Sequence, residues 1–313
     1  MSEARSIINP ETDRNLLIGI FCGLIGYTAL PIGDGMAKII GMDGYSGLQI
    51  AWGRYVFHVL ALLPFALIKF SPRELIPKRP LFQTFRASFI IACTFLFFTS
   101  LKEVPLADAL ALIFVAPLVV TGLSGPILGE KVGLHRWMAV FFGFVGAVII
   151  IQPGEGMFQW SALYALATGV FYGLYILITR LSANENHGLV NNFYMAVVGV
   201  IVLSLFVPFN WKELTPITIG YLAATGVAAA IGHGMIIAAT SRMEANTLAP
   251  VQYYELLVGA IVGYFMFGDV PAMTTWFGAF IIVISGLYIG YRENQKNKRA
   301  KQNLIEKTPD PSR

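Results

Sequence analysis

The sequence predicts an all-α polytopic membrane protein, with ten transmembrane helices arranged as two inverted five-helix repeats. Its composition, its long apolar blocks and a weak internal repeat carry this prediction. Of the 313 residues, 56% are hydrophobic and only 13% are charged. A soluble chain of this length needs more than about 20% charged residues to cover its surface. The composition therefore excludes a water-soluble globular fold.

The apolar residues come in blocks of the length that a membrane span requires. A helix needs roughly 20 residues to cross a hydrocarbon core about 30 Å thick. Short linkers rich in Gly, Pro, Asn and Asp separate the blocks, as is typical of turns. Residues 1–14 form an N-terminal segment, and residues 292–313 are expected to form a short helical extension followed by a basic, disordered tail. The expected spans are residues 15–40, 47–69, 82–101, 105–128, 134–151, 158–180, 189–208, 215–240, 245–267 and 272–291.

The chain repeats itself at low identity. A shift of 139 residues aligns Gly129-Glu130 with Gly268-Asp269, Trp137 with Trp276, Phe141 with Phe280 and Ile150 with Ile289. Each half, residues 15–152 and residues 157–291, then holds five spans. Because five is odd, the halves must have opposite orientations in the membrane. Such an inverted repeat is typical of alternating-access transporters, whose substrate site lies near the midplane between the halves.

The distribution of basic residues predicts the orientation. With the N-terminus in the cytoplasm, 18 of the 22 Lys and Arg residues fall in cytoplasmic segments, and only Lys102 and Lys212 fall in outer loops. The remaining two, Lys38 and Arg54, lie inside spans. Cytoplasmic loops carry an excess of Lys and Arg. We therefore expect both termini in the cytoplasm and the chain in the cell inner (plasma) membrane. The net charge of +4 is explained by orientation, without a nucleic-acid partner.

Several motifs point to one family. They are the segment 105–117, which reads PLADALALIFVAP, the sequence Leu-Gly-Glu at 128–130, Trp137, the glycine-rich run 143–153, and Arg54 in Trp-Gly-Arg-Tyr. Over residues 15–291 the chain resembles a ten-helix member of the drug/metabolite transporter (DMT) superfamily, of the type with two EamA domains. Its first half looks closest to the branch that contains S-adenosylmethionine and riboflavin transporters. The second half departs from the family pattern, because Asp269 replaces the Glu and Leu256 stands where the proline of Ala-Pro would align.

Apart from the basic residues counted with the cytoplasmic segments, five charged residues remain within the expected spans: Asp34, Lys38, Arg54, Asp108 and Glu255. Each would cost roughly 2.5–3.5 kcal/mol at a lipid-facing central position. They are therefore expected to face a polar cavity, to pair with one another, or to lie near the membrane interface. All five are candidate substrate-binding residues.

Glu255 is the most informative of these charges, because it lies near the middle of its span with no basic residue nearby in sequence. A buried, unpaired carboxyl suits proton coupling. A carboxylate beside aromatic rings, here Tyr253 and Tyr254, also suits a cationic ligand. The alternative is a protonated glutamic acid that hydrogen-bonds to a neighbouring helix.

Asp34 and Lys38 lie four residues apart on one helix face. They form either an interface ion pair, with Lys38 reaching outward, or an outer gate or substrate contact. Arg54 and Asp108 lie towards the same side, so a network of acids and bases that closes the outer vestibule is plausible; the sequence leaves the pairing open. Glu130 and Asp269 are expected to cap turns or the helices that follow them.

The other candidate substrate-binding residues are His58, His233, Tyr172 and Trp52, and Tyr27 and Tyr175 are further candidate cavity aromatics. Each of them has a packing role as its alternative. Cys22 and Cys93 fall inside spans and are expected to pack. Nothing in the sequence resembles a metal cluster, a catalytic motif or a cofactor motif, so no cofactor, metal or catalytic residue is expected.

These features favour a secondary transporter of a small zwitterionic or cationic metabolite, such as an amino acid, an S-adenosylmethionine-like sulfonium or a quaternary amine. Alternating access would be proton-coupled or would proceed by exchange. A riboflavin-like cofactor precursor transporter and a metabolite or drug exporter are alternatives. A membrane-embedded enzyme is remote, because the four histidines are scattered and no HExxH motif occurs. The expected partners are the substrate and the lipid bilayer, with the chain a monomer or homodimer.

Overall fold

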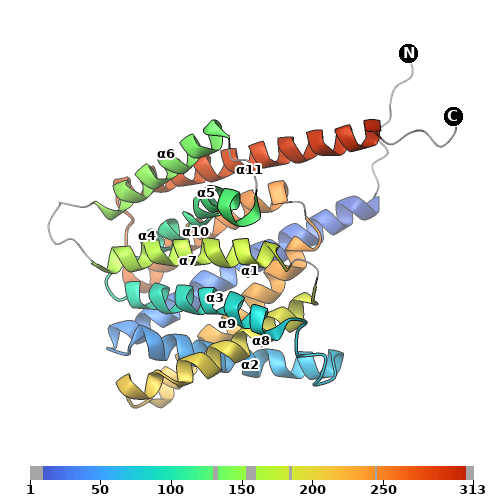
Figure 1. Ribbon diagram of the computed structural model, residues 1–313. Helices are drawn as coiled ribbons and strands as arrows, with labels where there is room; N and C mark the ends of the chain where they lie inside the picture. Colours follow the sequence, from blue (N-terminus) through green and yellow to red (C-terminus); the bar gives the residue numbers. More distant parts are fainter. Residues whose placement is uncertain (1–9, 130–132, 153–159, 183–184, 244, 308–313) are drawn as a thin grey trace.

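The computed structural model describes residues 10–129, 133–152, 160–182, 185–243 and 245–307, and every regular element within them is a helix (Figure 1). The all-α expectation is therefore confirmed. The elements are α1 (Pro10–Met42), α2 (Gly47–Lys69), α3 (Pro80–Ser100), α4 (Leu106–Ile113), α5 (Ala116–Leu128), α6 (Leu134–Ile151), α7 (Trp160–Arg180), α8 (Gly188–Ser204), the 3₁₀ helix η1 (Val207–Asn210), α9 (Pro216–Thr240), α10 (Ala245–Phe267) and α11 (Met273–Lys307).

The helices fit a membrane that the chain crosses many times. Eight stretches in the described residues are long and apolar enough to cross a membrane, and one of them, Leu106–Leu128, joins α4 and α5. Two further helices complete the ten expected spans. They are α8, an apolar helix of 17 residues, and α10, which has 23 residues and includes the polar stretch from Gln252 to Glu255.

The fourth span is interrupted, although the sequence predicted one continuous helix over residues 105–128. The amides of Phe114 and Val115 donate to the carbonyls of Ala111 and Leu112, each three residues earlier. Pro117, in the first turn of α5, has no amide hydrogen to continue the ladder. At the aligned position of the second half stands Leu256, and α10 runs through it without a break.

The last helix is longer than expected. α11 continues to Lys307, past the expected end of the span at residue 291. Residues 292–307 contain no Gly or Pro and consist mostly of good helix formers, so nothing local ends the helix. The expected disordered tail can therefore begin no earlier than residue 308, and it lies outside the described residues.

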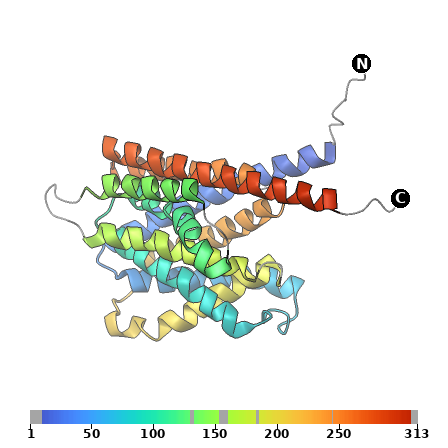
Figure 2. The same cartoon turned by 45° about the horizontal axis from the view of Figure 1, so that its top comes forward.

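The main helix contacts between the halves have equivalent contacts in which the two halves have exchanged places. α1 packs along α9, and the corresponding pair α3 and α7 packs in the same way. α6 packs along α11, and α2 packs along α8; each of these pairs joins equivalent helices of the two halves. In both views α6 and α11 lie together on one side of the bundle, with α2 and α8 on the opposite side (Figures 1 and 2).

Two equivalent turns reinforce this relation. Gly129 ends α5 with φ 71°, and Gly268 follows α10 with φ 70°. In each turn the glycine amide donates to the carbonyl four residues earlier, at 2.9 Å in both cases. Glycine is favoured here because the left-handed conformation carries little cost without a Cβ atom. These are the glycines that the 139-residue shift aligns.

The crossing of α6 and α11 depends on two glycines that meet backbone to backbone. A Cβ atom added to Gly146 would lie 2.7 Å from the carbonyl oxygen of Gly278. We expect Gly278→Val to destabilise the protein by about 1–3 kcal/mol, the usual cost of overpacking. A lower melting temperature in detergent would show it. Gly290→Val is the matched control, since Gly290 is on the same helix with open space around it. An equal loss in both variants would contradict the prediction.

Candidate functional site

A central cavity lies between the two halves, midway along the helices. Its volume is about 110 Å³. α1, α2, α3 and α4 contribute from the first half, and α7, α9 and α10 contribute from the second. The polar lining residues are Tyr27, Asp34, Arg54, Cys93, Thr94, Thr168, Tyr172, His233, Gln252 and Glu255.

The cavity holds more carboxyl than guanidinium groups. Asp34 of α1 and Glu255 of α10 line it together with one arginine, Arg54 of α2, and the imidazole of His233. The guanidinium carbon of Arg54 lies 5.3 Å from the ring centre of Phe98, and its Nη2 lies 3.5 Å from Nε2 of His233. Two carboxyl groups thus share the cavity with one guanidinium group. That balance favours a ligand with a cationic group.

Aromatic rings form another part of the wall. Tyr27 is buried to 5% exposure, and Phe114 lines the cavity where α4 ends. Tyr172 lines it from α7, and its ring stacks on Tyr175 at 6.3 Å with an interplanar angle of 13°. Rings of this kind can stack on a planar group or contact a cation.

The two histidines stack on each other, but only one of them lines the cavity. The rings of His58 and His233 are 5.8 Å apart and nearly parallel, at 6°. His233 is part of the lining, whereas His58 lies behind it with 1% exposure. Nε2 of His58 has no hydrogen-bond partner within the residues that the structure describes. His58 can therefore act on a ligand only through His233.

Lys38 pairs with an acid from the other half. Its Nζ lies 2.8 Å from Oδ2 of Asp269 and 3.3 Å from the carbonyl oxygen of Val104. Asp34, four residues away, faces the cavity instead. Asp269 was expected to cap a turn or a helix, and this ion pair corrects that expectation; Glu130 lies outside the described residues. Asp108 has Thr275, Asp269 and Lys38 as its electrostatic neighbours and does not line the cavity.

We call the end of the bundle that contains this ion pair the Lys38 end. Other contacts tie the halves together there. Gln49 exchanges hydrogen bonds with the backbone of Lys212, at 2.7 and 3.1 Å, and the Tyr45 hydroxyl donates to the Glu213 carbonyl at 2.8 Å. Eight of residues 31–41 of α1 are buried, whereas in residues 14–25 only two are. α1 is therefore more deeply buried near the Lys38 end than near its N-terminus.

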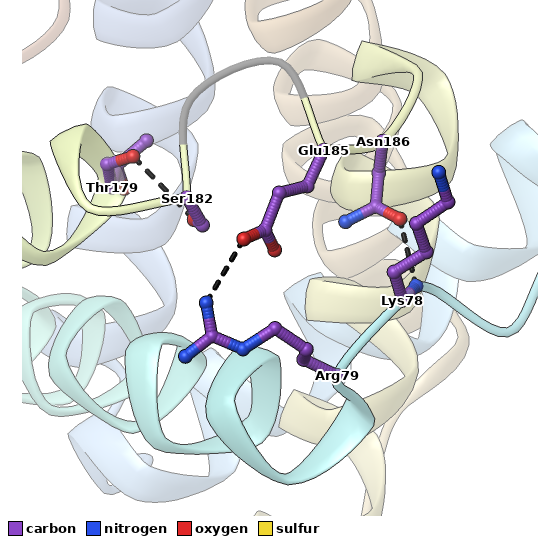
Figure 3. Close-up of polar contacts among 6 residues, drawn as sticks. All are labelled: Lys78, Arg79, Thr179, Ser182, Glu185 and Asn186. Carbon is purple, nitrogen blue, oxygen red and sulfur yellow. Dashed lines mark hydrogen bonds and ion pairs between the residues drawn. The ribbon is translucent and has the colours of Figure 1, made fainter.

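We call the opposite end the Arg79 end. Nη1 of Arg79 lies 2.9 Å from Oε1 of Glu185, and the Lys78 amide donates to Oδ1 of Asn186 at 2.7 Å (Figure 3). The loop between α2 and α3 thus contacts the loop between α7 and α8. Nearby, partial burial and then the charge of Lys69 lower the pKa of His187. The Arg79 side chain is 56% exposed, so this ion pair is weak.

Three candidate aromatics lie away from the cavity lining. Trp52 donates from Nε1 to Oγ of Ser204 at 2.9 Å, at the contact between α2 and α8. Tyr253 packs on Phe114 with ring centres 4.9 Å apart, and Tyr254 is half-buried in the core. Gln252 and Glu255 are three residues apart on one face of α10, and both line the cavity. The two tyrosines between them do not line it.

Arg86 was overlooked as an intramembrane charge because it was counted with the basic loop, although it lies inside the expected span of residues 82–101. α3 begins at Pro80, and Arg86 is buried within it to 2% exposure. Helix periodicity could have shown that Arg86 points inward, because it lies four residues before the cavity residue Ile90 and therefore on the same face of α3. Without Arg86, the expected cytoplasmic segments hold 17 Lys and Arg residues and the outer loops hold two.

The described residues contain no group of three or more His, Cys, Asp or Glu side chains placed to hold a metal ion. Both cysteines are free, and Cys93 lies in the cavity wall while Cys22 is half-buried. The charged and aromatic groups around the cavity are thus suited to binding a small molecule rather than to coordinating a metal.

Ten helical spans around a polar cavity, with the two halves in contact at both ends, define a membrane transporter of small molecules. The sequence model described as the EamA-like transporter family matches residues 17–152 and again residues 159–291, so the chain belongs to that family. It is a transporter and not an enzyme, and it is a multi-pass membrane protein.

Relatives of this chain are named for several different substrates. The S-adenosylmethionine uptake transporter of Rickettsia prowazekii (strain Madrid E) is 26% identical over 282 residues, which are 90% of this chain and 95% of that protein. The riboflavin transporter of Vibrio cholerae serotype O1 is 30% identical over 198 residues, 63% of this chain and 66% of that protein. The pseudopaline exporter of Pseudomonas aeruginosa (strain UCBPP-PA14) is 28% identical over 195 residues, 60% and 67% of the two chains.

A solved crystal structure has the same fold. It superposes with a TM-score of 0.60 over 91% of this chain and 98% of its own, at 15% sequence identity. At that identity the likeness extends to the arrangement of the helices and carries no information on the substrate.

Proposed function

We propose that the protein is a secondary transporter that carries a small zwitterionic or cationic metabolite across the cell inner membrane by alternating access. S-adenosylmethionine is the first candidate. The observation that carries the proposal is the pair of carboxyl groups, Asp34 and Glu255, that shares the central cavity with the single arginine Arg54. Two relatives that match over 95% of their own length, both S-adenosylmethionine uptake transporters, support this choice.

Each part of S-adenosylmethionine has a chemical counterpart in the cavity. Its sulfonium and ammonium groups suit the carboxyl groups of Asp34 and Glu255. Its adenine ring suits stacking against Tyr27 or Tyr172. In this proposal both termini are cytoplasmic, the Lys38 end faces outward, and the structure is closed on the outside.

Uptake of this kind needs no ATP. One positive charge that crosses a potential of 100 mV gains about 2.3 kcal/mol. At about 1.4 kcal/mol per tenfold ratio, that gain supports a concentration ratio of roughly 50-fold. An imposed proton gradient or exchange for an internal metabolite would serve equally well, and Glu255 is the candidate proton carrier.

Counterflow in proteoliposomes tests the proposal. Vesicles that contain the purified protein are loaded with unlabelled S-adenosylmethionine and diluted into a trace of the labelled compound. We expect a saturable, transient accumulation of label that protein-free vesicles lack. Unlabelled methionine, choline and riboflavin, each added in excess, define the substrate class by competition. An absence of counterflow with S-adenosylmethionine would reject it as the substrate.

Riboflavin transport is the second candidate. The aromatic part of the cavity wall, Tyr27, Phe114 and Tyr172, suits a flat and uncharged ring system, and the riboflavin transporter of Vibrio cholerae is 30% identical over the matched residues. Counterflow of labelled riboflavin without counterflow of S-adenosylmethionine would favour this function. It would also show that the cavity carboxyl groups do not select for positive charge.

A further inference from the structure

A polar extension of the cavity-lining face of α3 points towards the Arg79 end. Ile90, Thr94 and Phe97 line the cavity from this helix. Arg86 and Gln83 lie four and seven residues before Ile90, so they continue the same face by one and two turns. Both are buried inside the protein, at 2% and 0% exposure.

These two side chains lack the partners that buried polar groups require. Within the described residues, Arg86 contacts neither an acid nor a hydrogen-bond acceptor; its guanidinium carbon lies 5.5 Å from the ring centre of Tyr175, and its Nε is buried without a partner. Both amide atoms of Gln83 are also without a partner. A buried charge of this kind is strongly unfavourable unless something compensates it.

The chemistry of the two groups indicates what would compensate them. The guanidinium group presents its N–H donors in a planar fork that matches a carboxylate, and the amide of Gln83 supplies a further donor. Tyr175, under the guanidinium group, stacks on the cavity residue Tyr172. The orphaned donors are thus connected to the cavity through helix α3 and through the tyrosine pair of α7.

We propose that Arg86 and Gln83 form a subsite for the carboxylate of the substrate, next to the cavity on the side of the Arg79 end. The inference rests on the proposed function and deepens it. The carboxyl groups of Asp34 and Glu255 select the cationic part of the substrate, and Arg86 selects its carboxylate. The transporter thus distinguishes a zwitterionic amino acid derivative from the corresponding simple amine.

The test compares S-adenosylmethionine with decarboxylated S-adenosylmethionine, which lacks only the carboxylate. Dissociation constants are measured on the full chain in lipid nanodiscs. The wild type is expected to bind S-adenosylmethionine about tenfold to a hundredfold more tightly, the usual strength of a charge-assisted hydrogen bond. Arg86→Gln should abolish this preference and leave the affinity for the decarboxylated compound unchanged, and Arg86→Lys should retain part of it.

Arg73→Gln is the matched control, because it removes an exposed arginine at the same end and should keep the full preference. If Arg86→Gln does not fold, Gln83→Leu replaces it and should reduce the preference several-fold. An unchanged preference in the variant, or a wild type that binds both compounds equally, overturns the inference.

A second measurement separates this inference from the proposed function. If the wild type binds neither compound, the substrate proposal fails. Melting temperatures in sodium acetate and in sodium chloride of equal concentration then test whether Arg86 binds a carboxylate. Acetate should stabilise the wild type and Arg73→Gln but not Arg86→Gln. An equal response of the wild type and Arg86→Gln to acetate overturns the carboxylate subsite.

Discussion

Replacing Glu255 with glutamine is expected to lower transport driven by an imposed gradient by about 100-fold. Glutamine keeps the volume of the side chain and removes its charge, so that Asp34 alone balances Arg54 in the cavity. The cationic group of the substrate then loses its carboxylate partner. Removing one partner of such a charge pair typically costs 2–5 kcal/mol, and a loss of about 100-fold lies within that range. Initial uptake rates in proteoliposomes, measured from pH 5.5 to 8, give the effect.

Glu213→Gln is the matched control for this variant, because Glu213 is exposed at the Lys38 end and only its backbone accepts the bond from Tyr45. Counterflow without a gradient distinguishes the two roles of Glu255. Retained counterflow assigns Glu255 to proton coupling, and lost counterflow assigns it to substrate binding. An unchanged uptake rate with an unchanged pH profile would show that Glu255 has neither role.

Loss of the ion pair at the Lys38 end should have the largest effect on stability. Asp269→Asn is expected to lower the free energy of unfolding by about 3 kcal/mol, because Lys38 then keeps a buried charge without its carboxylate partner. The side chain of Lys38 is only 8% exposed. The double variant Lys38→Met/Asp269→Asn should recover most of the loss, since both charges are removed together. Unfolding in mixed detergent micelles measures all of the variants.

The ion pair at the Arg79 end provides the comparison. Its basic side chain is 56% exposed and its acid is 25% exposed. Glu185→Gln should therefore cost less than about 1 kcal/mol. Equal losses at the two ends would mean that burial does not set the strength of these contacts, and would contradict the prediction for Asp269.

The sequence was most informative where the membrane itself constrains the chain. Hydrophobic length placed the spans, and Glu255 could be singled out because a central carboxyl without a basic neighbour needs a polar environment. The break between α4 and α5 was missed, although Pro117 was visible, because hydropathy does not register a local loss of backbone hydrogen bonds.

Pairing between distant segments was beyond the reach of the sequence. Lys38 and Asp269 are 231 positions apart, and helix periodicity alone cannot show which acid a base will meet. Tyr253 and Tyr254 adjoin Glu255 in sequence, yet α10 turns both rings away from the cavity. Adjacent residues on a helix face different directions, so proximity in sequence was a poor guide to these two positions.

The ion pairs at both ends draw their base from the first half of the chain and their acid from the second: Lys38 with Asp269, and Arg79 with Glu185. If the gene were split between α6 and α7 and the halves were made as separate polypeptides, the first would carry both bases of these ion pairs and the second would carry both acids. Assembly of one copy of each half is therefore favoured over assembly of like halves. Both of these ion pairs then form only when one copy of each half meets the other.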